Sequence, residues 1–423
     1  MKKTITLLAL FISIVSVAQT TIEKKISSVE FGRDRTIKIH LPQGYETDTI
    51  HKYPLTIVLD NDFLFNLFVG NETLFATADL APKQIVVGLD VDPRVNQDVS
   101  TVSLNGGLTS NGKKFYNYIK KELIPYLEAN LKTSPFLTLA GQGKAGNFVT
   151  HFLKEEKPIF NSYIAISPTF NTNTPALFAS YNLKRLDAID NEFFLYVSND
   201  NAYTLDEQKI FTLLANSIEA LQTEKLHVKF DNFEKSSNIP TAISAAVPNS
   251  FTLAFDLYSA ISKEEFEEKV KELPPLEAIA YLEAKYLDIE YVYGTNLNVR
   301  LQDFYVIEGI VTDRMDGDYL RVLGDFALIK HPNSPLGDFY IGKFHELGKD
   351  YEKADFYYKA GYGKMDPSDP NADLFYQNID RIGKLMKEQP KDDPLPLDDE
   401  FDDQEDNEED DDQDNDDDND DND

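Results

Sequence analysis

The sequence has no cysteine and no tryptophan among its 423 residues. Without cysteine the chain cannot form a disulfide, use a thiolate nucleophile, ligate an iron–sulfur cluster or build a cysteine-liganded zinc site. Positive charge is also scarce, because 41 lysine and arginine residues stand against 73 aspartate and glutamate residues, a formal net charge of -32. The basic surface that nucleic-acid binding usually needs is therefore not expected.

Most of the negative charge lies at the C-terminal end. Residues 391–423 hold 21 acidic residues and one lysine, a net charge of -20, which leaves -12 for the first 390 residues. Because this segment offers almost nothing apolar to bury, we expect residues 389–423 to form a disordered acidic tail. Its alternatives are an electrostatic contact with a basic partner or weak calcium binding, although it lacks the glycine turn and spaced glutamate of an EF-hand loop.

The N-terminal end predicts export. Two lysines at Lys2 and Lys3 precede an apolar run over residues 5–17, and the run ends at the small residue Ala18. This order is typical of a secretory signal peptide over residues 1–19, and the run is shorter than the roughly 20 residues of a membrane-spanning helix. We expect a mature chain beginning near Gln19 or Thr20, periplasmic, outer-membrane-associated or secreted, with no membrane span after cleavage.

Residues 20–262 alternate short apolar runs with helical stretches, which predicts an α/β fold with a mainly parallel central sheet. Residues 112–130 form one expected helix, since apolar side chains recur there every four residues and line one face. The expected strands are Thr36–Leu41, Leu55–Asp60, Gln84–Leu89, Phe136–Ala140, Ser162–Ile166, Phe193–Val197 and Leu226–Phe230.

Residues 263–388 predict a small helical domain instead. Gly337–Leu347 and Tyr351–Tyr362 form an expected helical hairpin, in which small and aromatic residues alternate around Ala354 and Tyr358. This spacing is typical of tetratricopeptide-like helix pairs, and a plain helical bundle is the alternative. One such pair cannot bury its own face, so we expect it to pack against residues 263–294 or against the α/β domain.

The most informative segment is Leu137–Phe148, which reads as a strand, a glycine-rich turn and the start of a helix. Three further segments accompany it in a consistent order, at residues 53–60, 122–127 and 160–168. Together they resemble the putative esterase family of α/β-hydrolases, which includes esterase D-like and siderophore-ester hydrolases. The resemblance covers roughly residues 28–262 and implies an α/β-hydrolase fold whose glycine-rich turn is a nucleophile elbow.

The resemblance also implies a catalytic triad, and this chain departs from it at two positions. The serine position is occupied by Gly143, and the histidine position by Lys235 or Ser236, depending on where a one-residue gap is placed. Only the acid is retained, as Asp200. Acyl transfer needs a nucleophile and a base together, so we expect no catalytic residues and neither a cofactor nor a metal.

No histidine elsewhere is expected to substitute. The six histidines fall in expected strands, beside them, or in helices, and none falls in the loop where the resemblance places the base: His40, His51, His151, His227, His331 and His345. Glycine suits a turn with positive φ, and the turn with Gly143 and Lys144 is a candidate anion or oxyanion-type site. The alternative is a vestigial pocket with a solvated Lys144.

Three functions follow from these observations. The first is an exported, non-catalytic esterase-like scaffold, a pseudoenzyme that contacts another envelope protein through its helical region or acidic tail. The second is an active ester or thioester hydrolase with a non-standard nucleophile such as Ser236 or Ser237. The third is a small-ligand or carbohydrate-binding protein that uses the old substrate cleft, although the absence of tryptophan removes the strongest stacking platform.

Overall fold

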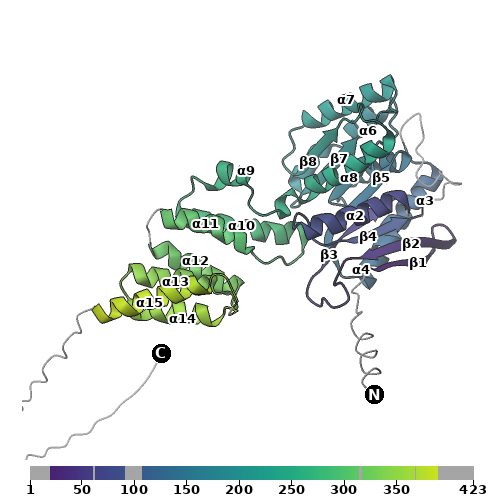
Figure 1. Cartoon of the computed structure of the whole chain (residues 1–423). Helices are drawn as coiled ribbons and strands as arrows, with labels where there is room; N and C mark the ends of the chain where they lie inside the picture. Colours follow the sequence, from purple (N-terminus) through teal and green to yellow (C-terminus); the bar gives the residue numbers. More distant parts are fainter. Residues whose placement is uncertain (1–19, 61, 91–106, 314–316, 367, 389–423) are drawn as a thin grey trace, which may run out of the picture.

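A computed structural model describes residues 20–60, 62–90, 107–313, 317–366 and 368–388 (Figure 1). The expected signal peptide at residues 1–19 and acidic tail at residues 389–423 lie outside these ranges. None of the described helices combines the length and apolar character that a membrane-spanning helix needs.

The N-terminal part is an eight-stranded sheet in the order β1-β2-β4-β3-β5-β6-β7-β8. β1 with β2 and β2 with β4 pair antiparallel, and all the other neighbours pair parallel. The predicted mainly parallel α/β fold is thereby confirmed. The strands are β1 Thr20–Ser28, β2 Arg33–Leu41, β3 Tyr53–Val58, β4 Ile85–Leu89, β5 Thr133–Gln142, β6 Ser162–Ile166, β7 Phe193–Ser198 and β8 Leu226–Asp231.

Each of the seven expected strands is present, with ends shifted by up to three residues, but β1 was not expected. Most of its side chains are exposed, so it lacks the continuous apolar run that marks the buried strands. β1 forms because β2 offers it a full antiparallel ladder, from Thr20 opposite Leu41 to Ser28 opposite Arg33.

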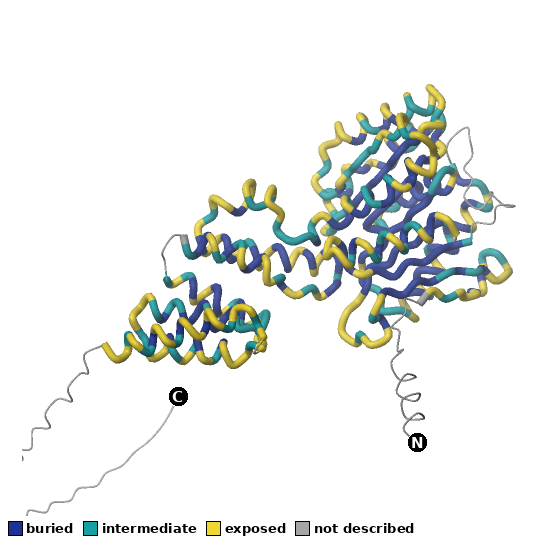
Figure 2. The backbone as a smooth tube through the Cα atoms, in the orientation of Figure 1, coloured by how far each residue is buried: buried dark blue, intermediate teal, exposed yellow. Residues whose placement is uncertain are grey.

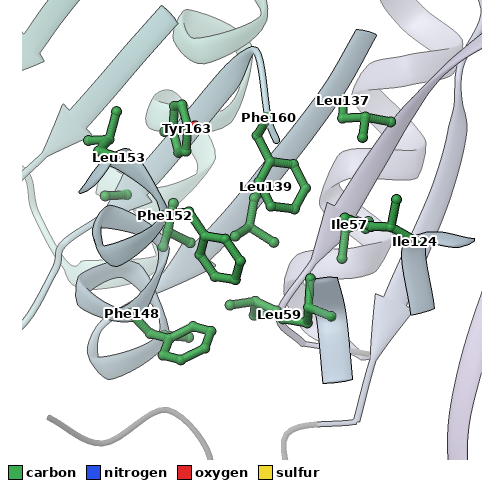
Figure 3. Packing of buried hydrophobic residues seen from close by; sticks show 14 of the residues in the cluster. Ile57, Leu59, Ile124, Leu137, Leu139, Phe148, Phe152, Leu153, Phe160 and Tyr163 are labelled. Carbon is green, nitrogen blue, oxygen red and sulfur yellow. The ribbon is translucent and has the colours of Figure 1, made fainter. Parts of the chain in front are cut away.

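Helices cover both faces of the sheet, and the side chains of each strand alternate between them. Ile57 and Leu139 point to one core, where the helix after β5 contributes Phe148 and Phe152 (Figure 3). Val58 of β3, with Phe136 and Ala140 of β5, points to a second core. The helices of this part are α2 Phe63–Thr77, α3 Ser110–Tyr118, α4 Ile124–Asn130, α5 Lys144–Thr150, α6 Thr174–Ser180, α7 Leu205–Glu219 and α8 Ile239–Phe255.

The helix expected over residues 112–130 runs through α3, a π-helical turn at Ile119–Leu123 and α4. The four apolar residues that define its periodicity are all fully buried: Phe115, Ile119, Leu123 and Leu127.

The C-terminal part of the described chain is helical, as predicted (Figures 1 and 2). Its first long helix, α10, packs directly on the α/β part, because the Tyr293 ring lies 5.0 Å from Phe136 and 5.5 Å from Phe255. The helices are α9 Lys263–Glu265, α10 Pro275–Tyr293, α11 Leu301–Asp313, α12 Gly317–Lys330, α13 Leu336–Leu347, α14 Tyr351–Gly363 and α15 Ala372–Glu388.

The helical region is attached at the amino end of the central strand β5. α10 ends at Gly294, which has φ 61°, and a Cβ added there would lie 2.6 Å from the Pro135 side chain. Close by, the guanidinium of Arg300 pairs with the Asp79 carboxylate and lies 4.8 Å from the Tyr258 ring. Gly143 follows the opposite end of β5, so the helical region leaves that end of the sheet uncovered.

Each of the helices α12 to α15 packs against the next one in sequence. Ala354 and Tyr358 of the expected hairpin are buried, as their spacing predicts. A Cβ added to Gly342 would lie 2.8 Å from the Tyr358 ring, so the small residue does permit the close approach. The hairpin packs mainly on α12 and α15 rather than on residues 263–294, because these two helices, which the sequence did not reveal, lie on either side of it.

Candidate functional site at the turn after strand β5

The glycine-rich turn joins β5 to α5 in one residue, Gly143. Its φ of 59° and ψ of -121° lie in a region that residues with a side chain rarely adopt. Among the described residues other than its chain neighbours, a Cβ added to Gly143 would have only Thr169 Oγ1 within 4 Å, at 3.9 Å. The turn therefore has the backbone conformation of a nucleophile elbow, which strains a residue with a side chain but not glycine, and there is space for a Cβ that Gly143 lacks.

The glycines on either side of the turn have a different role. A Cβ on Gly141 would lie 2.7 Å from the Ala145 carbonyl carbon, and one on Gly146 would lie 3.0 Å from the Gly141 oxygen. At both positions the backbones of β5 and α5 approach too closely for a side chain. The sharp strand-to-helix turn depends on these two glycines, whichever residue stands between them.

Hydrogen bonds fix the turn to the loop after β6. The Gly143 N–H donates to the Ile166 carbonyl at 3.0 Å, and the Gly143 carbonyl accepts from Asn147 and Thr169, each at 3.0 Å. Ser167, which follows β6, is buried with φ 44°, and its N–H donates to the Ser198 carbonyl of β7 at 2.8 Å. Hydrogen bonds thus hold the carboxyl ends of β5, β6 and β7 together at this end of the sheet.

Asp200, the expected acid, lies at the end of β7 and is only 6% exposed. One of its carboxylate oxygens accepts a hydrogen bond from the Ala202 N–H at 2.8 Å. The pKa of Tyr203 is raised above the ordinary tyrosine value, mainly because Tyr203 is buried and further because of the negative charge of Asp200. The Tyr203 hydroxyl donates to the Pro168 carbonyl. Asp200 therefore lies at the same end of the sheet as the turn, and the nearby Tyr203 bonds to the loop after β6, which bonds to Gly143.

The loop after β8 carries both alternatives for the histidine position. Lys235 is exposed and Ser236 is half-buried, with its N–H donating to the Phe233 carbonyl at 2.9 Å. The loop is held by Asn199, which is fully buried, accepts from the Phe233 N–H and donates to Asn232 Oδ1 at 2.8 Å. In the described residues, Asp200 forms no ion pair or hydrogen bond with Lys235 or Ser236.

The histidines lie elsewhere. Five of them bond or pair with groups outside the turn, and the sixth, His151, begins the 3-10 turn that continues α5. His151 is 2% exposed, and burial, reinforced by the charge of Lys154, lowers its pKa to about 4. The other partners are Glu72 and Thr21 for His40, Asp48 for His51, Glu192 for His227, Val299 for His331 and Asp350 for His345.

The candidate anion site keeps only part of its donors. The Gly143 N–H is already bonded to Ile166, which leaves the N–H of Lys144 as the first amide of α5. The Lys144 side chain is exposed and forms no ion pair in the described part of the chain. The turn therefore offers the exposed charge of the Lys144 side chain beside the first amides of α5.

The sequence analysis did not identify the residues that connect the loops at the carboxyl end of the sheet. Asn199 carries the clearest signal, since it stands next to the expected acid at the end of a buried strand. Thr169 and Tyr203 carry no such signal, because their roles depend on contacts between loops that are far apart in the chain.

The model of one protein family matches this sequence, the family described as putative esterase, over residues 28–245. That match spans 218 of 423 residues and includes β2 to β8 and the turn at Gly143. The chain belongs to the putative esterase family. No curated protein sequence matches this esterase-family chain significantly.

Solved structures share the fold. An uncharacterised protein from Capnocytophaga ochracea is 21% identical, with a TM-score of 0.74 over 86% of this chain and 100% of its own. An IroE-like serine hydrolase from Shewanella oneidensis is 16% identical, with a TM-score of 0.53 over 78% of this chain and 100% of its own. Both matches extend beyond the 218 residues of the family match, so part of the helical region of this esterase-family protein also recurs in them.

Proposed function

We propose that this protein is a non-catalytic member of the esterase family, exported to the bacterial envelope, that acts through contacts with another protein. The observation that carries the proposal is Gly143: an elbow with φ 59° and ψ -121° holds a residue without any atom that could attack an ester. Exposed Lys235 and half-buried Ser236 at the histidine position support it.

Glycine at the elbow also has a physical advantage. A residue with a side chain in such a conformation costs on the order of 1–3 kcal/mol, which proteins retain where catalysis requires it. Glycine adopts positive φ with little strain. Once nucleophilic attack is no longer needed, glycine at position 143 keeps the turn and removes its backbone strain. Gly141 and Gly146 must remain glycine in either case, because a Cβ there would clash with the backbone.

The helical region supports a role in protein contacts. Buried positions in α11–α12 and α13–α14 recur 34 residues apart, which is the period of tetratricopeptide repeats. We infer that residues 301–363 form two such repeats and that α15 covers the end of the array. The matched positions are Leu320 and Ala354, Gly324 and Tyr358, and Ala327 and Gly361.

The proposal of export rests on the N-terminal sequence and on the position of the first described strand. β1 starts at Thr20, next to the expected cleavage point. Fractionation of expressing cells, with intact mass of the recovered chain, tests it. An N-terminus at Gln19 or Thr20 in the envelope or medium is expected, and a full-length chain in the cytosol would contradict it.

The test of the missing activity uses the mature protein with a fluorophosphonate probe and an activated ester. The wild type should give no adduct by intact mass and no turnover above the buffer rate. Gly143→Ser with Lys235→His should form an adduct at residue 143, with Gly143→Ala and Lys235→His as the control that adds a side chain without a hydroxyl. An adduct on a wild-type serine, lost on mutation of Ser236 or Ser237, would refute the proposal in favour of a displaced nucleophile.

The test of partner contacts uses crosslinking in the envelope fraction, with crosslinked residues mapped on the chain. We expect them in residues 301–388 or in the acidic tail, and expect loss of the crosslink on truncation after residue 388 or on Phe356→Asp. Phe356 is 65% exposed on α14, so its substitution leaves the core intact. Crosslinks confined to the α/β part would contradict this assignment.

A further inference from the structure

The strand β8 forms one edge of the sheet, beyond β7 (Figure 1). A groove of about 510 Å³ runs along it, between α7 and the strand. Ala215, Ile218 and Glu219 line it from α7, and Leu226, Val228 and Phe230 line it from β8. On the strand side, Lys229 also lines the groove, between the apolar residues Val228 and Phe230.

The backbone of β8 presents hydrogen-bonding groups along this groove. In a parallel ladder, alternate residues turn both backbone groups to the same neighbouring strand. β7 donates to the carbonyls of Lys225, at 2.8 Å, and Asp231, at 3.2 Å, so the odd-numbered residues of β8 face β7. The N–H and C=O groups of Leu226, Val228 and Phe230 therefore face away from the sheet, and in the described residues only the Leu226 carbonyl has a partner there, the Thr223 hydroxyl at 2.9 Å.

The two edge strands of the sheet, β1 and β8, differ in how well they are protected against pairing with another chain. Edge strands usually carry charges, proline or a bulge, which prevent pairing with another chain. β1, the opposite edge, has three consecutive charged residues at Glu23, Lys24 and Lys25. β8 pairs with β7 without a register shift and contains no proline, and its charged residues Lys229 and Asp231 pair with each other at 3.8 Å. Its apolar side chains lie at the residues whose backbone groups are open.

We propose that β8 is a homodimer interface, at which the strands of two copies pair antiparallel about a two-fold axis through Val228. This register opposes Val228 to Val228 and Leu226 to Phe230 of the second copy, so all three outward-facing residues of each strand form hydrogen-bonded pairs. The apolar side chains of the two grooves then lie on one face of a continuous sheet.

The charges on the other face fit the same register. Lys225 faces Asp231 of the second copy, a pair of opposite sign. His227 faces Lys229 of the second copy, and the Glu192 carboxylate, 2.7 Å from His227, lies beside this pair. The acidic tail fits less well, because its strand would place carboxylates over Leu226, Val228 and Phe230.

The test is sedimentation of the mature chain, residues 20–423, over a range of concentrations at about 0.15 M salt, where repulsion between the acidic tails is screened. We expect a monomer–dimer equilibrium in the wild type. Val228→Pro removes one outward N–H per copy and leaves the bonds to β7, so the dissociation constant should rise about thirtyfold. Val228→Thr is the matched control, since it keeps the N–H and the side-chain shape, and its dissociation constant should change less than about threefold.

A second variant and a second measurement keep the test decisive. Ala215→Arg fills the groove from a half-exposed helical position, and it should also weaken the dimer even if Val228→Pro fails to fold. In hydrogen exchange, the amides of Val228 and Phe230 should gain protection with concentration, while the Lys229 amide, which faces β7, should not change.

Three results would overturn the proposal. The first is a monomer at every concentration, and the second is a dimer that Ala215→Arg leaves intact. The third is a monomer in which the Val228 and Phe230 amides are already protected, because another part of the same chain would then cover β8. None of these depends on whether the protein hydrolyses esters.

Discussion

Replacing Gly143 with serine should destabilise the protein by about 1–2 kcal/mol. The strained backbone costs a residue with a side chain on the order of 1–3 kcal/mol, and the reduced freedom of the unfolded chain returns about 0.4–1 kcal/mol. Packing adds little, because within the described part of the chain, apart from its neighbours in sequence, the new Cβ meets only Thr169 Oγ1, at 3.9 Å. The cost therefore measures backbone strain alone.

Urea unfolding followed by circular dichroism at 25 °C tests this value against two other glycines. Gly70→Ala in the exposed part of α2, where a Cβ meets nothing within 4 Å, should stabilise by about 0.5–1 kcal/mol. Gly141→Ala should cost more than Gly143→Ser, because its Cβ would lie 2.7 Å from a backbone atom that cannot move freely. A Gly143→Ser protein as stable as the wild type would refute the reasoning, since the turn would then hold no strain for glycine to relieve.

Three further predictions concern other parts of the fold. Asp79→Asn should destabilise by about 1–2 kcal/mol in urea, because it leaves the largely buried Arg300 guanidinium without its carboxylate, and an unchanged midpoint would show that the pair contributes nothing. The pKa of His151 is lowered to about 4, so protonation of His151 favours the unfolded state. The free energy of unfolding should be greatest above pH 6.5 and fall by about 3 kcal/mol as the pH drops from 6.5 to 4. This pH dependence should be weaker in His151→Leu. Gly294→Ala should cost about 2 kcal/mol or more, because φ 61° and the Pro135 contact both oppose a Cβ, and thermal unfolding at or above the wild-type midpoint would contradict this.

Local signals explain why much of the α/β part could be predicted. The strands are continuous apolar runs, and the turn around Gly143 requires glycines that are visible in the sequence as Gly141, Gly143 and Gly146. β1 was missed because its side chains are mostly exposed, so its ladder with β2 leaves no apolar run in the sequence.

The candidate site was only partly predictable for a related reason. The positions of Gly143 and Asp200 follow from the ends of buried strands, which the sequence reveals. The bonds that join Asn199 to the loop after β8, and Tyr203 to the loop after β6, connect residues more than 30 positions apart. No pattern within a single segment encodes such contacts.

The shared core between the sheet and the helical region makes residue 262 a poor place to cut the chain. Phe136 of β5 and Phe255 of α8 pack against Tyr293 of α10, beyond the segment that matches the esterase family. A fragment ending at residue 262 would expose these rings, and it should aggregate or unfold where the longer chain does not. Here the recognisable family unit is smaller than the unit that folds, so an expression fragment should extend through the helices to residue 388.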